Sequence, residues 1–251
     1  MALITPLTER LIALPCWEIP SHTAPNGERT YEAPIGLASS VTTILSGSRD
    51  NTEIELWRES VGTEKADAIR DFAAARGTDH HSLIEQFLKD HKEPAFDYVQ
   101  SSYWSSTRPF LDTIDHCLLN EGTIWHPEGF AGKLDNISYL SRAELLVWDK
   151  NHGAVSVIQV ADDLQPTLID WKTADTPRNP KKMYEYSLQV AAYVAGANYV
   201  YGNLGLDIQR AKIVVALPDQ PPQIKTLIKE ELDQLFEHFL ARLQRYTFAK
   251  K

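Results

Sequence analysis

Three residues in two strand-like segments could hold a divalent metal ion and act on water beside it. Asp135 ends the segment Gly-Phe-Ala-Gly-Lys-Leu-Asp, and Asp170 and Lys172 lie in the segment Leu-Ile-Asp-Trp-Lys-Thr. Side chains two apart on a strand point to the same face, so Asp170 and Lys172 should project together, opposite Trp171. Mg²⁺ and Mn²⁺ prefer oxygen ligands, which the two carboxylates and the Trp171 carbonyl would supply. Lys172 would then lie beside the metal-bound water.

Each of these residues also has a simpler interpretation. An aspartate at a strand end most often caps a turn, and Glu121, just before the first predicted core strand, would alone be a solvated loop acid. Asp170 and Lys172 could form a plain ion pair. That pair follows the apolar Leu168-Ile169, where an ion pair would be partly desolvated and of doubtful net stability. Because partly buried charges of this kind cluster at functional sites, we favour a metal site.

Further candidate residues lie on predicted helices. His81 and Glu85 are four residues apart, so they share one helix face; a surface contact is the alternative. His80 competes with His81, and spacing alone does not separate them. Gln189 and Tyr193 have the same spacing on the helix that follows the lysine strand. They could orient the lysine or a substrate phosphate, or simply pack.

Composition excludes several classes of protein. The 251 residues are 43% hydrophobic and 24% charged, which is ordinary for a soluble globular chain. The net charge of −9 argues mildly against nucleic acid, although metal-binding carboxylates contribute to it and a local basic groove can coexist with it. Cys16 and Cys117 lie far apart, which excludes a sequence-local zinc or iron–sulfur cage and favours a reducing, intracellular compartment. No apolar run approaches the length of a membrane span.

The order of elements predicts one α/β domain. A hairpin is expected around Pro25-Asn26-Gly27, with strands at 16–19 and 29–31. Helices are predicted at 53–59, from Thr63 to a break at Arg76-Gly77-Thr78, and at 79–89, 98–119, 180–199 and 224–246. Strands are predicted at 122–125, 130–140, 143–148, 155–160, 167–171 and 210–217, with a turn at 149–153. The domain would comprise a hairpin and helical subregion (1–120), a core (121–217) and a C-terminal helix (218–251).

Four blocks of sequence, in order, resemble the PD-(D/E)XK nucleases of the RecB type. The branch is similar to the mitochondrial genome-maintenance exonuclease and to phage single-strand exonucleases. The blocks are Ser40-Val41-Thr42-Thr43-Ile44-Leu45 with Trp57-Arg58, the RGTxxHxxxE segment from Arg76 to Glu85, Glu121 with Gly129 to Asp135, and Leu168 to Thr173 with Tyr186, Gln189 and Tyr193. No single block is specific, but their order is.

The resemblance implies a restriction-endonuclease-like fold, a mixed central sheet flanked by helices with a helical N-terminal subregion. It implies a Mg²⁺- or Mn²⁺-dependent exodeoxyribonuclease that acts on single-stranded DNA ends in repair, recombination or replication. A structure-specific or double-strand endonuclease and a catalytically silent nucleic-acid-binding module are the alternatives. We expect the protein in the cytoplasm, associated with the nucleoid. Without a helicase motif, unwinding would need a partner in trans.

The resemblance also assigns roles to residues. It selects His81 over His80 as a metal ligand, with Asp135, Asp170 and the Trp171 carbonyl. Lys172 would position the attacking water, and the remaining catalytic and nucleic-acid-binding candidates are Glu121, Gln189, Tyr193, the phosphate contacts Arg76 and Lys133, and the base-stacking Tyr103 and Trp104. The iron–sulfur members need four cysteines, so no such cluster is expected. The excursion at 138–165 is longer than expected and could be an extra hairpin that changes substrate access.

Overall fold

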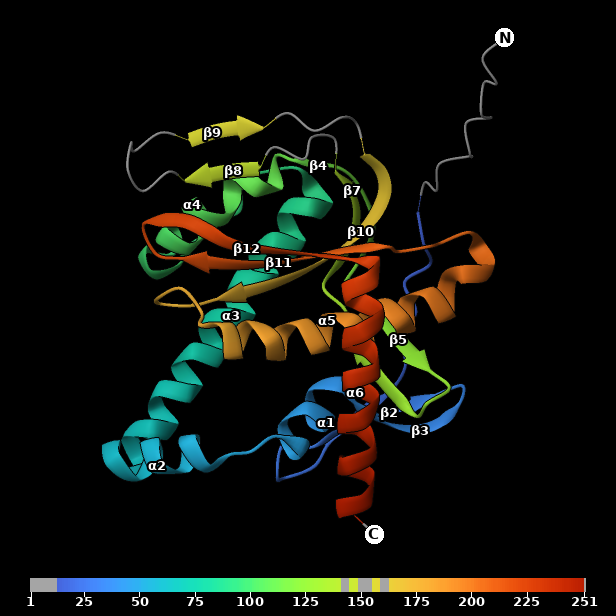
Figure 1. Cartoon of the computed structure of the whole chain (residues 1–251). Coiled ribbons are helices and arrows are strands. Elements are labelled where there is room, and N and C mark those ends of the chain that lie inside the picture. Colours follow the sequence, from blue (N-terminus) through green and yellow to red (C-terminus); the bar gives the residue numbers. More distant parts are fainter. Residues whose placement is uncertain (1–12, 141–144, 149–154, 159–162, 251) are drawn as a thin grey trace.

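The computed structural model describes residues 13–140, 145–148, 155–158 and 163–250 (Figure 1). Its helices are α1 (Val41–Ser48), α2 (Thr52–Val61), α3 (Thr63–Asp90), α4 (Tyr98–Leu111), α5 (Pro180–Tyr201), the 3₁₀ turn η1 (Gly202–Leu204) and α6 (Lys229–Ala249). Its strands are β1 (Ser21–Thr23), β2 (Arg29–Ala33), β3 (Gly36–Ser40), β4 (Ile114–Asn120), β5 (Thr123–His126), β6 (Phe130–Lys133), β7 (Asn136–Leu140), β8 (Leu145–Trp148), β9 (Val155–Ile158), β10 (Asp163–Thr173), β11 (Arg210–Leu217) and β12 (Gln220–Ile228).

The central sheet has the strand order β12-β11-β10-β7-β4. Strands β10 and β11 are parallel and are joined through α5, and the other neighbours are antiparallel. Leu168 and Ile213 face the core that α5 and α6 cover, and Ile169 and Trp171 face the core formed with α3 and α4. The predicted mixed α/β fold, with a sheet flanked by helices, is confirmed (Figure 1).

A second five-stranded sheet was not foreseen. Its order is β1-β2-β3-β6-β5, and it lies against α5 on the side away from the central sheet (Figure 1). It exists because the N-terminal hairpin extends through β3, which pairs in parallel with β6. The hairpin turn falls at the predicted residues 25–27, but its first strand is β1 rather than 16–19.

The chain crosses between the two sheets at two adjacent points. Residues 130–140, predicted as one strand, form β6 in the second sheet and β7 in the central sheet, with Leu134-Asp135 between them. Glu121-Gly122 makes the same crossing between β4 and β5. Backbone hydrogen bonds from Glu121 N to Asp135 O (2.8 Å) and from Leu134 N to Gly122 O (2.9 Å) join the two crossings. We call these four residues the inter-sheet seam.

Two predicted helix boundaries were wrong because tertiary contacts overrode local signals. Helix α3 continues through Gly77, where a break was expected. A glycine inside a helix costs only about 1 kcal/mol, and Thr78 uses its hydroxyl on Ala74 O in the preceding turn instead of capping a new helix. The helix predicted at 98–119, for which a break near Pro109 was the alternative, ends as α4 at Leu111, and residues 114–120 become β4 because they pair with β7.

The start of the last helix was also mispredicted. Pro221-Pro222 lies inside β12 and α6 begins only at Lys229. Strand β12 is at the edge of the central sheet, where proline is tolerated because one side of the strand needs no ladder donors. The remaining predicted strands and helices agree with the structure to within a few residues.

The long excursion between β7 and β10 contains a hairpin. Strands β8 and β9 pair antiparallel, with Leu145 opposite Ile158. The prediction of an extra hairpin is therefore confirmed, while the ends of the strands predicted at 143–148 and 155–160, and the turn at 149–153, lie outside the described residues. Among the described residues no helix is both long and apolar enough to cross a membrane.

Candidate metal centre and active site

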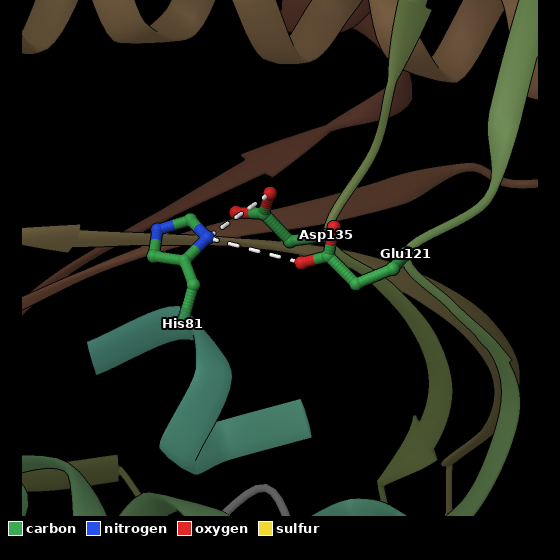
Figure 2. Close-up of side chains that lie close together, drawn as sticks. All are labelled: His81, Glu121 and Asp135. Atoms are coloured by element: carbon green, nitrogen blue, oxygen red, sulfur yellow. Dashed lines mark ion pairs between the residues drawn. The ribbon is translucent and has the colours of Figure 1, made fainter. Parts of the chain in front are cut away.

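Three side chains converge at the inter-sheet seam (Figure 2). His81 Nδ1 lies 3.5 Å from Asp135 Oδ1 and 3.9 Å from Glu121 Oε1. One ligand atom from each residue lies within 4.8 Å of the other two. Bonds from a divalent cation to oxygen or nitrogen are about 2.0–2.6 Å long, so one ion can bridge such a set. The middle of α3 supplies the imidazole, and the seam supplies both carboxylates.

The seam positions its carboxylates through the backbone. Glu121 has a φ of 57°, in the left-handed region that non-glycine residues seldom adopt. Such strain persists where the surrounding structure fixes it, and it is concentrated at functional sites. Here the hydrogen bond from Glu121 N to Asp135 O fixes the turn and brings the two acids onto neighbouring positions.

Trp171 connects this cluster to the central sheet. Strand β7 begins at Asn136, opposite Ile169, so β10 has no strand partner on that side beyond this point. The Trp171 N–H instead donates to Asp135 Oδ2 at 2.8 Å, and the Trp171 carbonyl accepts from His81 Nε2 at 2.9 Å. One residue of β10 therefore orients both an acid and the imidazole.

The Trp171 carbonyl also determines the tautomer of His81. A carbonyl only accepts, so Nε2 carries the proton and a neutral ring leaves a lone pair on Nδ1. That lone pair faces the carboxylates of Asp135 and Glu121, an arrangement that a bound cation stabilises. A backbone carbonyl behind the imidazole is the usual partner that orients a metal-binding histidine. The residues therefore fit a divalent ion held by His81, Glu121 and Asp135.

Two predicted ligands lie outside the three-residue cluster. The Trp171 carbonyl was expected to bind metal, but it accepts the hydrogen bond of His81 and serves to orient the ring. Asp170 was expected to be a ligand, but it lies outside the three-residue cluster and pairs with Lys172. Glu121, predicted as a catalytic residue, provides the third donor. His80 is buried and contacts Thr107 on α4, so only His81 reaches the site.

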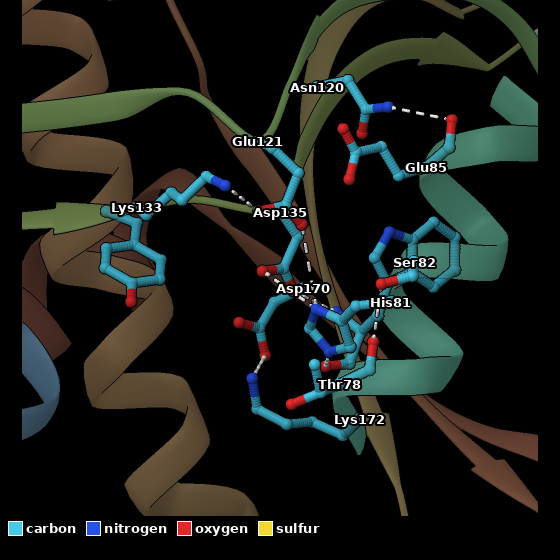
Figure 3. Close-up of polar contacts among 12 residues, drawn as sticks. Thr78, His81, Ser82, Glu85, Asn120, Glu121, Lys133, Asp135, Asp170 and Lys172 are labelled. Atoms are coloured by element: carbon cyan, nitrogen blue, oxygen red, sulfur yellow. Dashed lines mark hydrogen bonds and ion pairs between the residues drawn. The ribbon is translucent and has the colours of Figure 1, made fainter. Parts of the chain in front are cut away.

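Asp170 and Lys172 form a second part of the site (Figure 3). As predicted, they project to the same face of β10, and Lys172 Nζ lies 2.6 Å from Asp170 Oδ2. Gln189 Nε2 donates to Asp170 Oδ1 and to the Tyr193 hydroxyl, both at 3.3 Å. Asp170 is 1% exposed. The carboxylate is thus held between the lysine and helix α5, which fixes the position of the ammonium group.

Burial determines the protonation of the site. It raises the pKa of Asp170 to about 6, against the lowering effect of Lys172, and it also raises the pKa of Asp135 and of Glu121. Burial, with Lys172 nearby, lowers the pKa of His81, which favours the neutral ring. Burial opposes the charge on Lys172, but Asp170 and Asp135 outweigh it and raise its pKa. Three acids, Lys172, Lys133 and a neutral imidazole leave one more acid than base, an excess that a cation would offset.

A cavity of about 670 Å³ opens above these groups. Its lining includes His81, Glu121, Lys133, Lys172 and the Trp171 backbone region, together with Arg29, Arg178, Tyr186 and the small side chains of Ala73, Ala74 and Gly77 on α3. The small residues leave room along the helix. The cavity has room for a ligand of nucleotide size, and it exposes His81, Glu121 and Lys172.

Three predicted nucleic-acid contacts are placed in the interior. The Arg76 side chain is 3% exposed, pairs with Asp175 at 2.6 Å and lies over the Tyr103 ring at 4.8 Å. Tyr103 donates to the same aspartate, and Trp104 donates to Glu93. Tyr103 and Trp104 are 5% and 3% exposed, so neither ring offers a face to a base. These three expectations are wrong in this structure: the residues connect α3 and α4 to the segment after β10.

Lys133 and several unforeseen residues do reach the cavity. Lys133 Nζ pairs with Glu121 Oε2 at 2.8 Å and remains half exposed, so its predicted phosphate contact stays a prediction. Arg29 and Arg178 line the cavity but were not predicted as site residues. A sequence pattern could have indicated Arg178, because the segment Arg-Asn-Pro-Lys-Lys places three cations around the start of a helix.

Comparisons with known proteins add little to this geometry. No family model matches the chain, and no curated protein matches it. Among solved structures, the crystal structure of SSO0001 aligns with a TM-score of 0.35 at 10% sequence identity, over 79% of this chain and 74% of that chain. A likeness of that size carries no argument, so the functional interpretation depends on the site itself.

Proposed function

We propose that this protein is a metal-dependent deoxyribonuclease that hydrolyses phosphodiester bonds, with single-stranded DNA ends as its substrate. One observation carries the proposal: His81 Nδ1, with a lone pair, faces two carboxylates, and Lys172 stands beside them on the same cavity. The resemblance of the four sequence blocks to RecB-type PD-(D/E)XK nucleases supports the same reaction. Mg²⁺ or Mn²⁺ is the proposed ion.

Each side chain has a defined part in this proposal. His81, Glu121 and Asp135 would hold the ion, which when bound polarises the scissile phosphate and lowers the pKa of a bound water. Lys172 holds that water in line and stabilises the negative charge that develops on the phosphate oxygens. Asp170 keeps the ammonium in place from below the cavity.

Helix α5 supports the lysine through two side chains. Gln189 donates to both Asp170 and the Tyr193 hydroxyl, so Asp170 cannot rotate away without breaking a hydrogen bond. We infer that Gln189 and Tyr193 are positioning residues. Their substitution should lower the rate of cleavage without abolishing metal binding.

The test compares Lys172→Ala and Asp135→Asn with the wild-type protein on end-labelled single-stranded DNA in Mn²⁺. Because Lys172 and Asp135 face the reacting groups, we expect rates about 10²–10⁴-fold lower in both variants. Lys229→Ala and Asp233→Asn are matched controls, because that pair lies on the surface of α6. Wild-type rates in the Lys172 and Asp135 variants, with the fold checked by circular dichroism, would refute the proposal.

Two further measurements separate the alternatives. A circular single-stranded substrate is cut only by an endonuclease, so resistance of the circle together with release of nucleotides from a linear strand indicates an exonuclease. Calorimetric titration with Mn²⁺ tests the silent binding module, which would show DNA binding without metal binding. A matched RNA strand tests the sugar preference.

A further inference from the structure

Two cations at the start of helix α5 have no ion-pair partner within 4.0 Å among the described residues. Arg178 precedes the helix, and Lys182 lies in its first turn, half-buried. Among the described residues neither forms an ion pair with a carboxylate, whereas the neighbouring Lys181 pairs with Glu53 at 2.6 Å. In a chain of net charge −9, two neighbouring cations without ion pairs, one of them lining the cavity, require an explanation.

The local helix chemistry makes the arrangement more unusual. The N-terminus of a helix carries a partial positive charge, so acids are favoured there and lysines are disfavoured. The first turn of α5 contains no acid. Burial, followed by the nearby Arg49 and Arg178, lowers the pKa of Lys182. A negatively charged ligand would offset this repulsion, and the helix N-terminus would add to its binding.

Arg178 is held in a fixed position before any ligand arrives. Gln223 on β12 accepts from Arg178 N at 2.7 Å and donates to Arg178 O at 3.0 Å. The Arg178 Nη2 atom donates to Thr173 O at 3.3 Å, while its buried Nε has no hydrogen-bond partner among the described residues. Its side chain lines the same cavity as Lys172. The Arg178 guanidinium is therefore held at the edge of a space that a ligand can enter.

Tyr186 joins this cationic group to the catalytic lysine. The ring centroid lies 5.0 Å from Lys182 Nζ and 5.4 Å from Lys172 Nζ. The Tyr186 ring thus lies near both ammonium groups, and Lys172 remains paired with Asp170.

We propose that Arg178 and Lys182 form a second phosphate-binding site, which holds a phosphate of the nucleic acid other than the one being cleaved. This inference rests on the proposed nuclease function. It names the phosphate whose binding would set which bond of the strand lies at the metal site. The chemistry recognised is a phosphate group. It can be the terminal monoester of a strand or an internal diester next to the scissile bond.

The test measures binding without cleavage. Fluorescein-labelled 12-nucleotide single strands carrying a 5′-phosphate, a 5′-hydroxyl or a 3′-phosphate are titrated by anisotropy in EDTA at several salt concentrations. We expect Arg178→Gln/Lys182→Gln to bind about 10-fold more weakly, and the slope of log affinity against log salt to fall in magnitude by about 1. Lys181→Gln, on the same helical turn, is the matched control and should bind like the wild-type protein.

The outcomes distinguish the sources of the phosphate. A loss confined to one phosphorylated end assigns the site to that terminal monoester, and an equal loss on all three strands assigns it to an internal diester. Arg178→Lys/Lys182→Arg keeps both charges and should restore most of the affinity. Equal affinity of Arg178→Gln/Lys182→Gln and the wild-type protein, or no binding by the wild-type protein at low salt, overturns the proposal.

These results are independent of catalysis. If the wild-type protein does not cleave DNA but Arg178→Gln/Lys182→Gln binds it more weakly, the phosphate-site proposal stands and the nuclease proposal is refuted. Normal cleavage with unchanged binding and an unchanged KM in the double variant would leave the nuclease intact and refute the phosphate site.

Discussion

At the scale of single residues, one backbone oxygen gives His81 its role. Because the Trp171 carbonyl accepts from Nε2, the Nδ1 lone pair is directed at Asp135 and Glu121. A donor set of one nitrogen and two oxygens is less suited to Mg²⁺ than an all-oxygen set, since Mg²⁺ is a hard ion. Divalent transition ions accept imidazole more readily. The imidazole in this donor set therefore favours Mn²⁺ over Mg²⁺.

We expect Mn²⁺ to bind more tightly than Mg²⁺. His81→Ala should weaken Mn²⁺ binding by at least about 10-fold, because losing even a residue that only orients a metal ligand typically weakens metal binding by about 10-fold or more. The same substitution should affect Mg²⁺ less, because the carboxylates remain. Calorimetric titration of the metal-free protein with each ion measures both effects. His22→Ala, at an exposed ion pair with Glu32, is the control. Equal losses for the two ions would contradict the assigned role of the imidazole.

At the scale of elements, the site depends on how closely α5 approaches β6. A Cβ atom added at Gly132 would lie 2.7 Å from Tyr193 Cε1, so the Tyr193 ring packs directly on the glycine. That ring carries the hydroxyl that accepts from Gln189, which in turn donates to Asp170. A glycine on one sheet thereby influences the position of the Asp170 carboxylate on the other.

Gly132→Ala should displace the Tyr193 ring and loosen Asp170. We expect a loss of about 1–3 kcal/mol in the free energy of unfolding, typical of overpacking, together with a lower rate of cleavage. Chemical denaturation and the nuclease assay measure the two effects. Gly202→Ala is the control, because no atom lies within 4 Å of a Cβ there. Unchanged stability and rate in Gly132→Ala would show that the ring is not confined as described.

At the scale of the whole molecule, an aromatic cluster joins the second sheet to α5 and α6. The His126 ring stacks on Phe130 at 5.1 Å between centroids and meets the edges of Tyr199 and Phe236 at 5.6 and 5.3 Å. Burial lowers the pKa of His126, and Glu128 opposes this only in part. The neutral ring is therefore the form that packs between the layers.

The contribution of His126 to stability should for this reason be lost in mild acid. The unfolded chain takes up a proton on His126 near pH 6.5, whereas the folded chain does so only at lower pH. At this position the unfolded state then binds more protons, so the His126 contribution to the free energy of unfolding decreases as the pH drops below about 6.5. His126→Phe should reduce the difference in Tm between pH 8 and pH 5, measured by thermal denaturation. An unchanged difference would indicate that His126 titrates normally in the folded protein.

The sequence by itself was sufficient for features with local causes. The period-two pattern of β10 correctly placed Asp170 and Lys172 on one face and Trp171 on the other, because strand geometry alone determines the direction of side chains. The i,i+4 spacing correctly placed Gln189 and Tyr193 together. The mixed α/β class followed from the order of the elements.

Only the tertiary structure decided which residues meet across sheets and helices. Residues 130–140 carry no break in their apolar pattern, yet the chain changes sheets at Asp135, because β3 pairs with β6 while β10 pairs with β7. That crossing placed Glu121 with Asp135 and His81, and left Asp170 to hold Lys172. Aromatic residues such as Tyr103 and Trp104 occur both in protein cores and at binding surfaces, and only the packing of α4 showed that these two are buried. Long-range pairing and burial depend on partners far apart in the sequence, which local periodicity does not encode.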